Sequence, residues 1–222
     1  MAFGLLQAPF TCHEIDPLWA LACEHLEKDS NPMQKHAAAV ALGFGYAGEP
    51  RQDLYEGLSA LFEDDKNDIE CLSMAAVSLG LIFVGCANTA DEENKSHVES
   101  IESMIMSKVL EMSEEDRKHA LSRFFAVALG LLYLGCGSKC DKVLELCETV
   151  PGNFGQYMKL TVKTCAYAGT GDVLQVQELL HLVAEYVTDE DDSKEGEEKK
   201  DGLEENNKNK NNKNKNNKNK NN

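Results

Sequence analysis

One pattern recurs along the chain: ALGFGYAG at residues 41–48, SLGLIFVG at 78–85 and ALGLLYLG at 128–135. A shorter copy, CAYAG, follows at residues 165–169. The closing glycines are 37, 50 and 34 residues apart, so the third unit carries 13 to 16 residues more than its neighbours. Self-similarity at this kind of spacing indicates a repeat architecture and not a single globular core.

Each copy of the pattern sits in an apolar stretch rich in Ala, Gly and Leu. Each stretch closes on a glycine, which ends a helix readily because it tolerates the left-handed conformation. The segments that follow combine an apolar stripe with acids, which predicts amphipathic helices at 53–62, 98–112, 140–147 and 173–186. Helices that are apolar all round are buried. We therefore predict an all-α solenoid of helix-turn-helix repeats, with small-residue helices inside and acidic amphipathic helices outside.

The longest outer segment, 98–112, shows its two faces most clearly. Residues at three- and four-residue steps form an apolar stripe that should face inward: Val98, Ile101, Ile105, Val109 and Met112. A second set follows the same steps on a different face and is left for a partner: Ser100, Met104, Ser107 and Glu111. The preceding residues, 88–96, are predicted to form a loop.

The chain changes character after residue 188. Residues 189–205 are mostly acids and lysines, and residues 206–222 are only Asn and Lys, so no side chain there can join a core. We predict a solenoid over 1–188 and a disordered, low-complexity tail over 189–222. The tail holds ten acids and nine lysines, which leaves 28 acids against 13 bases, a net charge of −15, on the folded part.

This acidic surface repels phosphate backbones and anionic membranes, so we expect neither nucleic acid nor a membrane as a partner. No run approaches 18 consecutive apolar residues, and the apolar start of the chain lacks a basic region before it. Four of the eight cysteines lie inside apolar helical runs, as free thiols do. These features favour a soluble protein of a reducing, intracellular compartment.

Catalytic and metal chemistry find weak support in the sequence. Cys136 with Cys140, or Cys12 with His13, would give a zinc ion one pair of ligands, but no second pair follows at a suitable spacing. A cysteine nucleophile with one of the six histidines stays open, although no cysteine lies in a nucleophile-type turn. The glycines at 43, 45 and 48 imitate a dinucleotide fingerprint without its preceding strand. We expect no metal, no cofactor and no enzyme.

The alternation of glycine-bearing apolar helices with acidic ones resembles the proteasome/cyclosome repeat family. Residues 163–181, residues 81–87 and the acidic segment after the last repeat narrow the resemblance to one of the large non-ATPase subunits of the proteasome base. The likeness covers roughly residues 1–190. It implies a non-catalytic scaffold of the cytoplasm and nucleus, in contact with the ATPase ring and other regulatory-particle subunits.

The resemblance also implies a docking surface for ubiquitin and for the ubiquitin-like domains of shuttle receptors. In the family, the docking surface spans consecutive outer helices, and three acids on the middle helix are important for docking. In this chain the three equivalent positions are Glu111, Ser107 and Ser100. Neighbouring residues offer substitute acids or apolar contact: Glu102, Glu99, Met104 and the acids at 91–93. The adjacent outer helices add Asp53, Glu56, Asp141 and Glu145. A purely structural solenoid is the alternative, and a hydrolase is the least favoured function.

Overall fold

The computed structural model describes residues 17–26 and 30–182, which form helices and turns and contain no strand. Two compact units divide the chain, residues 1–171 and residues 172–222. Helices α2 to α10 belong to the first unit; in the second, residues 173–182 are helical. The tail predicted over 189–222 lies outside the described residues. No helix of the described ranges is both long and apolar enough to cross a membrane.

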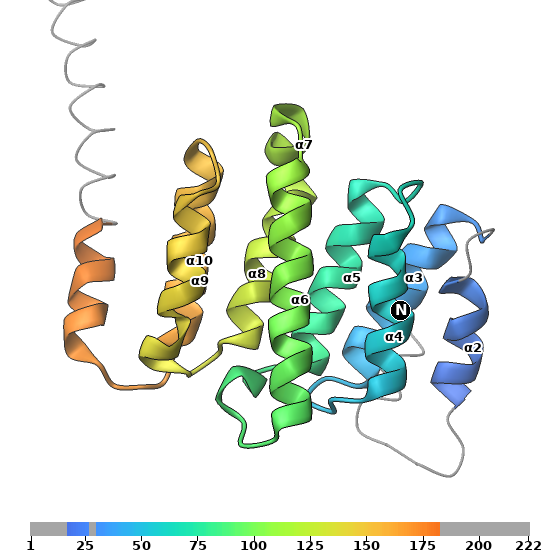
Figure 1. The fold of residues 1–222 in the computed structure, drawn as a ribbon, viewed down its shortest axis with the longest axis horizontal. Helices are drawn as coiled ribbons and strands as arrows, with labels where there is room; N and C mark the ends of the chain where they lie inside the picture. Colours follow the sequence, from blue (N-terminus) through green and yellow to red (C-terminus); the bar gives the residue numbers. More distant parts are fainter. Residues whose placement is uncertain (1–16, 27–29, 183–222) are drawn as a thin grey trace, which may run out of the picture. The chain divides into compact units, whose positions relative to one another are not determined.

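The helices of the first unit form two layers (Figure 1). The inner layer holds the small-residue helices in chain order: α3 (Pro32–Gly45), α5 (Ile69–Ile82), α8 (Arg123–Leu132) and α10 (Asn153–Ala166). The outer layer holds α2 (Pro17–Leu26), α4 (Gln52–Glu63), α6 (Glu92–Glu111) and α9 (Asp141–Glu148). Each inner helix packs on the next, and each outer helix packs on an inner one. The predicted all-α solenoid is confirmed.

Glycines inside the inner helices bring neighbouring backbones into direct contact. A Cβ atom on Gly80 of α5 would lie 2.8 Å from the carbonyl oxygen of Ala128 in α8. One on Gly43 of α3 would lie 2.7 Å from the Cα of Ser78 in α5. Both distances are too short for a real Cβ. The spacing of the inner layer therefore depends on the absence of a side chain at these positions.

The closing glycine of each repeat lies three residues beyond its inner helix and has a positive φ: 79° at Gly48, 68° at Gly85 and 69° at Gly135. Each donates its N–H to the next inner helix: Gly48 to Leu81 O at 2.9 Å, Gly85 to Leu131 O at 2.9 Å and Gly135 to Cys165 O at 3.1 Å. The acceptor is always four residues before the next closing glycine. Backbone hydrogen bonds thus repeat at equivalent places along the solenoid.

The predicted inward stripe is confirmed, since all five stripe residues are buried. Four of them lie on α6, and Met112 is its C-cap residue. The predicted loop over 88–96 is wrong in part, because α6 already begins at Glu92. Asp91 caps it by accepting a hydrogen bond from the Glu93 N–H, and acids in the first turn suit the positive end of the helix. The extra residues of the third repeat lengthen α6 to 20 residues and add the short helix α7 (Glu114–Lys118).

The inner helices are less completely buried than their composition predicts. Met33 of α3 is 76% exposed and Phe44 38%, and Leu134, two residues after α8, is 40% exposed. Helices α5 and α8 each contact two inner helices and one outer helix. Within residues 17–26 and 30–182, no third layer covers the remaining face of the inner helices. Trp19 of α2 behaves as a packing residue, since its ring lies against the position of Gly57 in α4.

The variant Gly80→Ala should lower the free energy of unfolding by about 1–3 kcal/mol. The added methyl group meets backbone atoms of Ala128, which can retreat only if α8 moves as a whole. Ser103→Ala, on the exposed face of α6, should change it by less than about 0.5 kcal/mol. Urea denaturation followed by circular dichroism measures both values. Equal tolerance at the two positions would contradict the packing described here.

Candidate docking surface

The middle outer helix α6 is joined to α4 through an aromatic cluster. The Tyr55 ring of α4 lies 4.5 Å, centroid to centroid, from the His97 ring of α6, and Phe83 lies 5.6 Å from His97. The Tyr55 hydroxyl is also 2.7 Å from the Ser100 hydroxyl. Ser100 is therefore exposed but hydrogen-bonded, and it marks the flank of α6 that faces α4.

Glu102 lies on the opposite flank of α6, where its carboxylate accepts a hydrogen bond from the Tyr133 hydroxyl at the end of α8. Burial raises the pKa of Glu102, and the hydrogen bond from Tyr133 only partly offsets this effect. Burial also raises the pKa of Tyr133, and the contact with Glu102 adds to it. The structure does not place Glu102 on the same face as Ser100 and Glu111, so it is a poor substitute for a missing docking acid.

The outward face of α6 brings together Ser107 and Glu111, both exposed and on successive turns. Met104 belongs to this row in the sequence but is partly covered and packs against the core. Leu110 is 47% exposed beside Glu111 and was missed by the sequence analysis. Its signal was available, because Leu110 falls outside the inward stripe and lies three residues after Ser107. Glu99 is exposed on the Glu102 flank.

Both candidate acids of α4 already interact with a neighbouring side chain of this segment. Asp53 pairs with Arg51, and the hydrogen bond from that guanidinium lowers the pKa of the carboxyl. Glu56 is exposed and accepts a hydrogen bond from Gln52 at 2.7 Å.

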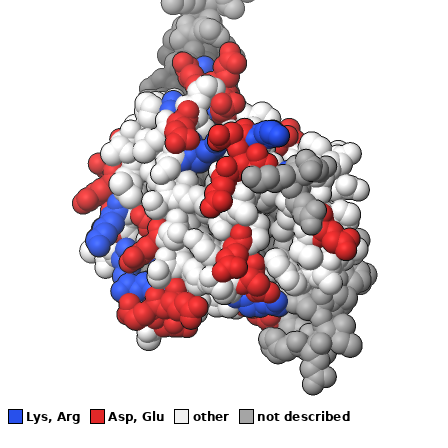
Figure 2. Space-filling model, turned by 45° about the vertical axis from the view of Figure 1, so that its right-hand side comes forward, with Lys and Arg blue, Asp and Glu red and all other residues white. Residues whose placement is uncertain are grey.

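On α9 the two candidate acids are both exposed. Asp141 and Glu145 lie one turn apart, and the neighbouring Leu146 is 42% exposed. The α9 pair therefore offers carboxylates beside apolar surface, much as α6 does. Figure 2 shows that acids gather in separate clusters with uncharged surface between them on the face in view.

Among the described residues, one group of side chains could hold a metal ion by distance alone. Ligand atoms of His36, Asp68 and Glu70 lie within 4.8 Å of one another, and His119 lies 3.8 Å from Glu70. However, the two ring nitrogens of His36 face different carboxylates, Asp68 at 3.1 Å and Glu70 at 4.0 Å. Asp68 Oδ1 also caps α5 by accepting from the Cys71 N–H. The contacts of His36 with Asp68 and Glu70 link α3 to the start of α5.

Comparison with known proteins identifies the family, although no family model matches the chain. The chain is 36% identical over 185 residues, 83% of its length, to the 26S proteasome non-ATPase regulatory subunit 2 of Dictyostelium discoideum. It is 34% identical over 77% of its length to the 26S proteasome regulatory subunit rpn-1 of Neurospora crassa. The rpn1 subunit of Schizosaccharomyces pombe matches 68% of the chain, also at 34% identity.

The chain belongs to the family of proteasome regulatory subunit 2. It spans 19%, 17% and 16% of these three relatives, so it corresponds to a small part of each. The helical solenoid agrees with the repeat architecture that the sequence predicts for this family.

The Dictyostelium relative is named as a non-ATPase regulatory subunit, and six of the cysteines of this chain are poorly suited to nucleophilic catalysis. Burial raises the pKa of Cys71 and Cys140 to about 11 and that of Cys147 to about 12. Burial also raises the pKa of Cys86, Cys136 and Cys165. A nucleophilic cysteine needs a lowered thiol pKa. These six thiols stay protonated at neutral pH, which argues against a cysteine hydrolase.

The pH dependence of stability should reveal the burial of Glu102. Because the folded-state pKa lies above the ordinary 4.5, the ionised carboxylate destabilises the fold at higher pH, whereas below 4.5 both states hold the proton. The stability of the unmodified chain should therefore fall relative to Glu102→Gln as the pH rises above 4.5. Urea titrations at several pH values give this difference, and a constant difference would mean that Glu102 is solvated.

Proposed function

We propose that the chain is part of a non-catalytic scaffold of the 26S proteasome regulatory particle, and that its outer helices dock ubiquitin and the ubiquitin-like domains of shuttle receptors. The names of the relatives support the scaffold role. The docking role rests chiefly on one observation, which is the exposed face of α6 with Leu110 beside Glu111. The ATPase ring and other regulatory-particle subunits are its proposed neighbours, in the cytoplasm and nucleus.

The chemistry of this face fits such a partner. Ubiquitin-like folds present an aliphatic patch ringed by Lys, Arg and His. Leu110 offers aliphatic contact at the centre, and the carboxylate of Glu111 offers a counter-charge for the basic ring. An exposed ion pair contributes less than about 1 kcal/mol, so its main effect is on encounter and orientation. Weak and reversible capture suits a surface that receives cargo and passes it on.

A second candidate function is a purely structural one. Met33, Phe44 and Leu134 keep apolar surface exposed on the inner layer, where a fixed neighbouring subunit could cover it. A structural segment needs no affinity for free ubiquitin. Titration of the labelled chain with ubiquitin separates the two functions, because only the docking function predicts saturable binding.

If the outward face of α6 is the site, Leu110→Ser and Glu111→Arg should each weaken ubiquitin binding while helicity stays unchanged. The first change removes apolar contact, and the second sets a like charge against the basic ring of the partner. We expect a loss of about three- to tenfold for each, as for contacts of about 1 kcal/mol. Raising the salt concentration should reduce the effect of the Glu111 change, since exposed charges are screened.

The matched control is Glu178→Arg, which makes the same charge reversal on the helix at 173–182. It should leave ubiquitin binding within about twofold, as expected for a surface change outside the site. If both reversals weaken binding equally, net charge and not a site accounts for the effect. If neither does, docking on α6 is wrong and the α9 acids Asp141 and Glu145 become the next candidates.

A further inference from the structure

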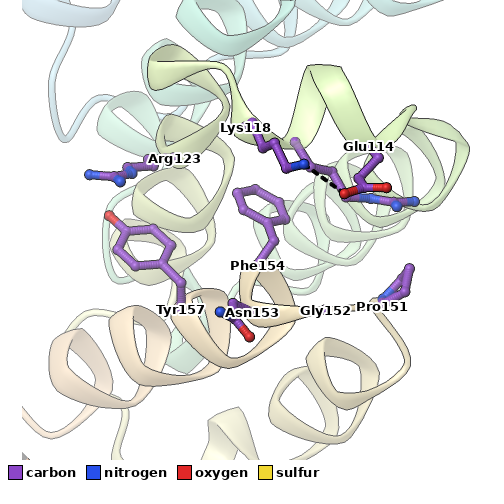
Figure 3. A pocket seen from close by; sticks show the side chains of 9 residues that line it. Glu114, Lys118, Arg123, Pro151, Gly152, Asn153, Phe154 and Tyr157 are labelled. Carbon is purple, nitrogen blue, oxygen red and sulfur yellow. Dashed lines mark hydrogen bonds and ion pairs between the residues drawn. The ribbon is translucent and has the colours of Figure 1, made fainter. Parts of the chain in front are cut away.

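A half-open groove of about 710 Å³ lies where α7 meets the first turns of α8 and α10. Three separate stretches of the first unit form it: residues 114–118, Arg123 and residues 151–157. Figure 3 shows Phe154, Tyr157 and Arg123 on one side of this groove and the Glu114–Lys118 pair on the other. Neither Ser107 nor Glu111 lines it, so the groove is distinct from the proposed docking face.

Aromatic rings form one side of the groove. Phe154 and Tyr157 lie on successive turns of α10 with their ring centroids 6.4 Å apart and their planes nearly parallel. The Arg123 guanidinium lies over the Tyr157 ring, 5.5 Å from its centroid. Tyr157 remains 37% exposed, so part of this apolar surface is available to a ligand. A flat side chain could pack here with a cation beside it.

The two arginine side chains of the groove have N–H donors that make no hydrogen bond within the described structure. Among the described residues, neither Arg117 nor Arg123 forms an ion pair with a carboxylate. The Arg117 guanidinium donates one hydrogen bond, from Nη2 to the Leu110 carbonyl at 3.3 Å, and its Nε is buried without an acceptor. A guanidinium has five N–H donors. The groove therefore holds two arginines that form no ion pair, although Glu114 lies near enough to Arg117 to interact with it electrostatically, in a chain whose net charge is −16.

The first turn of α10 adds to the same electrostatic character. Its N-cap is Gly152, with φ 77°, and no side chain caps the helix. The first N–H groups of a helix have no partner within it, and they carry partial positive charge. Lys118 is the third cation of the lining and pairs with Glu114 at 2.6 Å. Three cations against one carboxylate make the groove positive on an acidic protein.

We propose that this groove binds an acidic peptide segment in which an aromatic or aliphatic side chain lies among glutamates or aspartates. The carboxylates would meet Arg117 and Arg123, because guanidinium groups bind carboxylates through two parallel hydrogen bonds. The apolar side chain would pack on Phe154 and Tyr157. A volume of about 710 Å³ is in the range for a drug-sized ligand and exceeds what one phosphate or carboxylate fills.

The test uses the full chain and a fluorescein-labelled peptide of sequence Glu-Glu-Phe-Glu-Glu, titrated by fluorescence anisotropy. Replacing Arg117 and Arg123 together by Gln should weaken binding about tenfold or more, since each removes charge-assisted hydrogen bonds. The control replaces Lys139 and Lys142 by Gln, two exposed cations outside the groove, and removes the same charge. It should leave binding within about twofold. Circular dichroism checks that both variants fold.

Two further arms separate a peptide site from a general anion site. The peptide Glu-Glu-Ala-Glu-Glu should bind more weakly than the phenylalanine peptide, and inorganic phosphate should displace the latter only poorly. Both results support the proposal. It would be overturned by equal losses in the two double variants, by no loss in the arginine variant, or by equal binding of the two peptides with full displacement by phosphate.

Discussion

The close approach of successive inner helices is the constraint on which the rest of the structure depends. Gly43 and Gly80 leave room for the backbone of the following helix, and the closing glycines bond across the same boundaries. The N–H of each closing glycine reaches the next inner helix only at this spacing, so the close packing and the hydrogen bonds occur together. Small residues in the inner layer are therefore a geometric requirement, beyond their contribution to the core.

The outer layer follows from this spacing. Once α5 and α8 are set close together, α6 lies over them and buries its five-residue stripe, while its flanks meet side chains from either direction. Tyr55 reaches one flank from α4, and Tyr133 reaches the other from the end of α8. The strip between these flanks, with Ser107, Leu110 and Glu111, remains open to a partner. Packing within the solenoid thus decides which part of an amphipathic helix is available for binding.

Much of this architecture could be predicted from the sequence because it depends on local periodicity. The repeat, the two layers and the inward stripe of α6 all follow from apolar spacing along one helix. Periodicity does not reveal which neighbour covers a given side chain. Glu102 was taken for an available acid because Tyr133, its partner, comes 31 residues later in the chain. Met104 was taken for the apolar contact, although packing against the core leaves Leu110 the more exposed residue.

The start of α6 was missed for a different reason, since a run of acids resembles a loop unless its capping role is recognised. Asp91 accepts the hydrogen bond that begins the helix, and the acids after it are favourable at that end. No sequence pattern predicts the groove beside α7. Its lining comes from three stretches that meet only when α10 packs on α8.

The hydrogen bonds of the closing glycines have one more consequence. They join main-chain atoms only. The donor must be a glycine, whereas the residue whose carbonyl accepts can carry any side chain. The distance between the outer helices α4, α6 and α9 therefore does not depend on which residues these helices expose to solvent. Surface residues could therefore differ from one family member to the next while the spacing between the outer helices stayed the same. A partner that spans two outer helices would meet them at a constant separation.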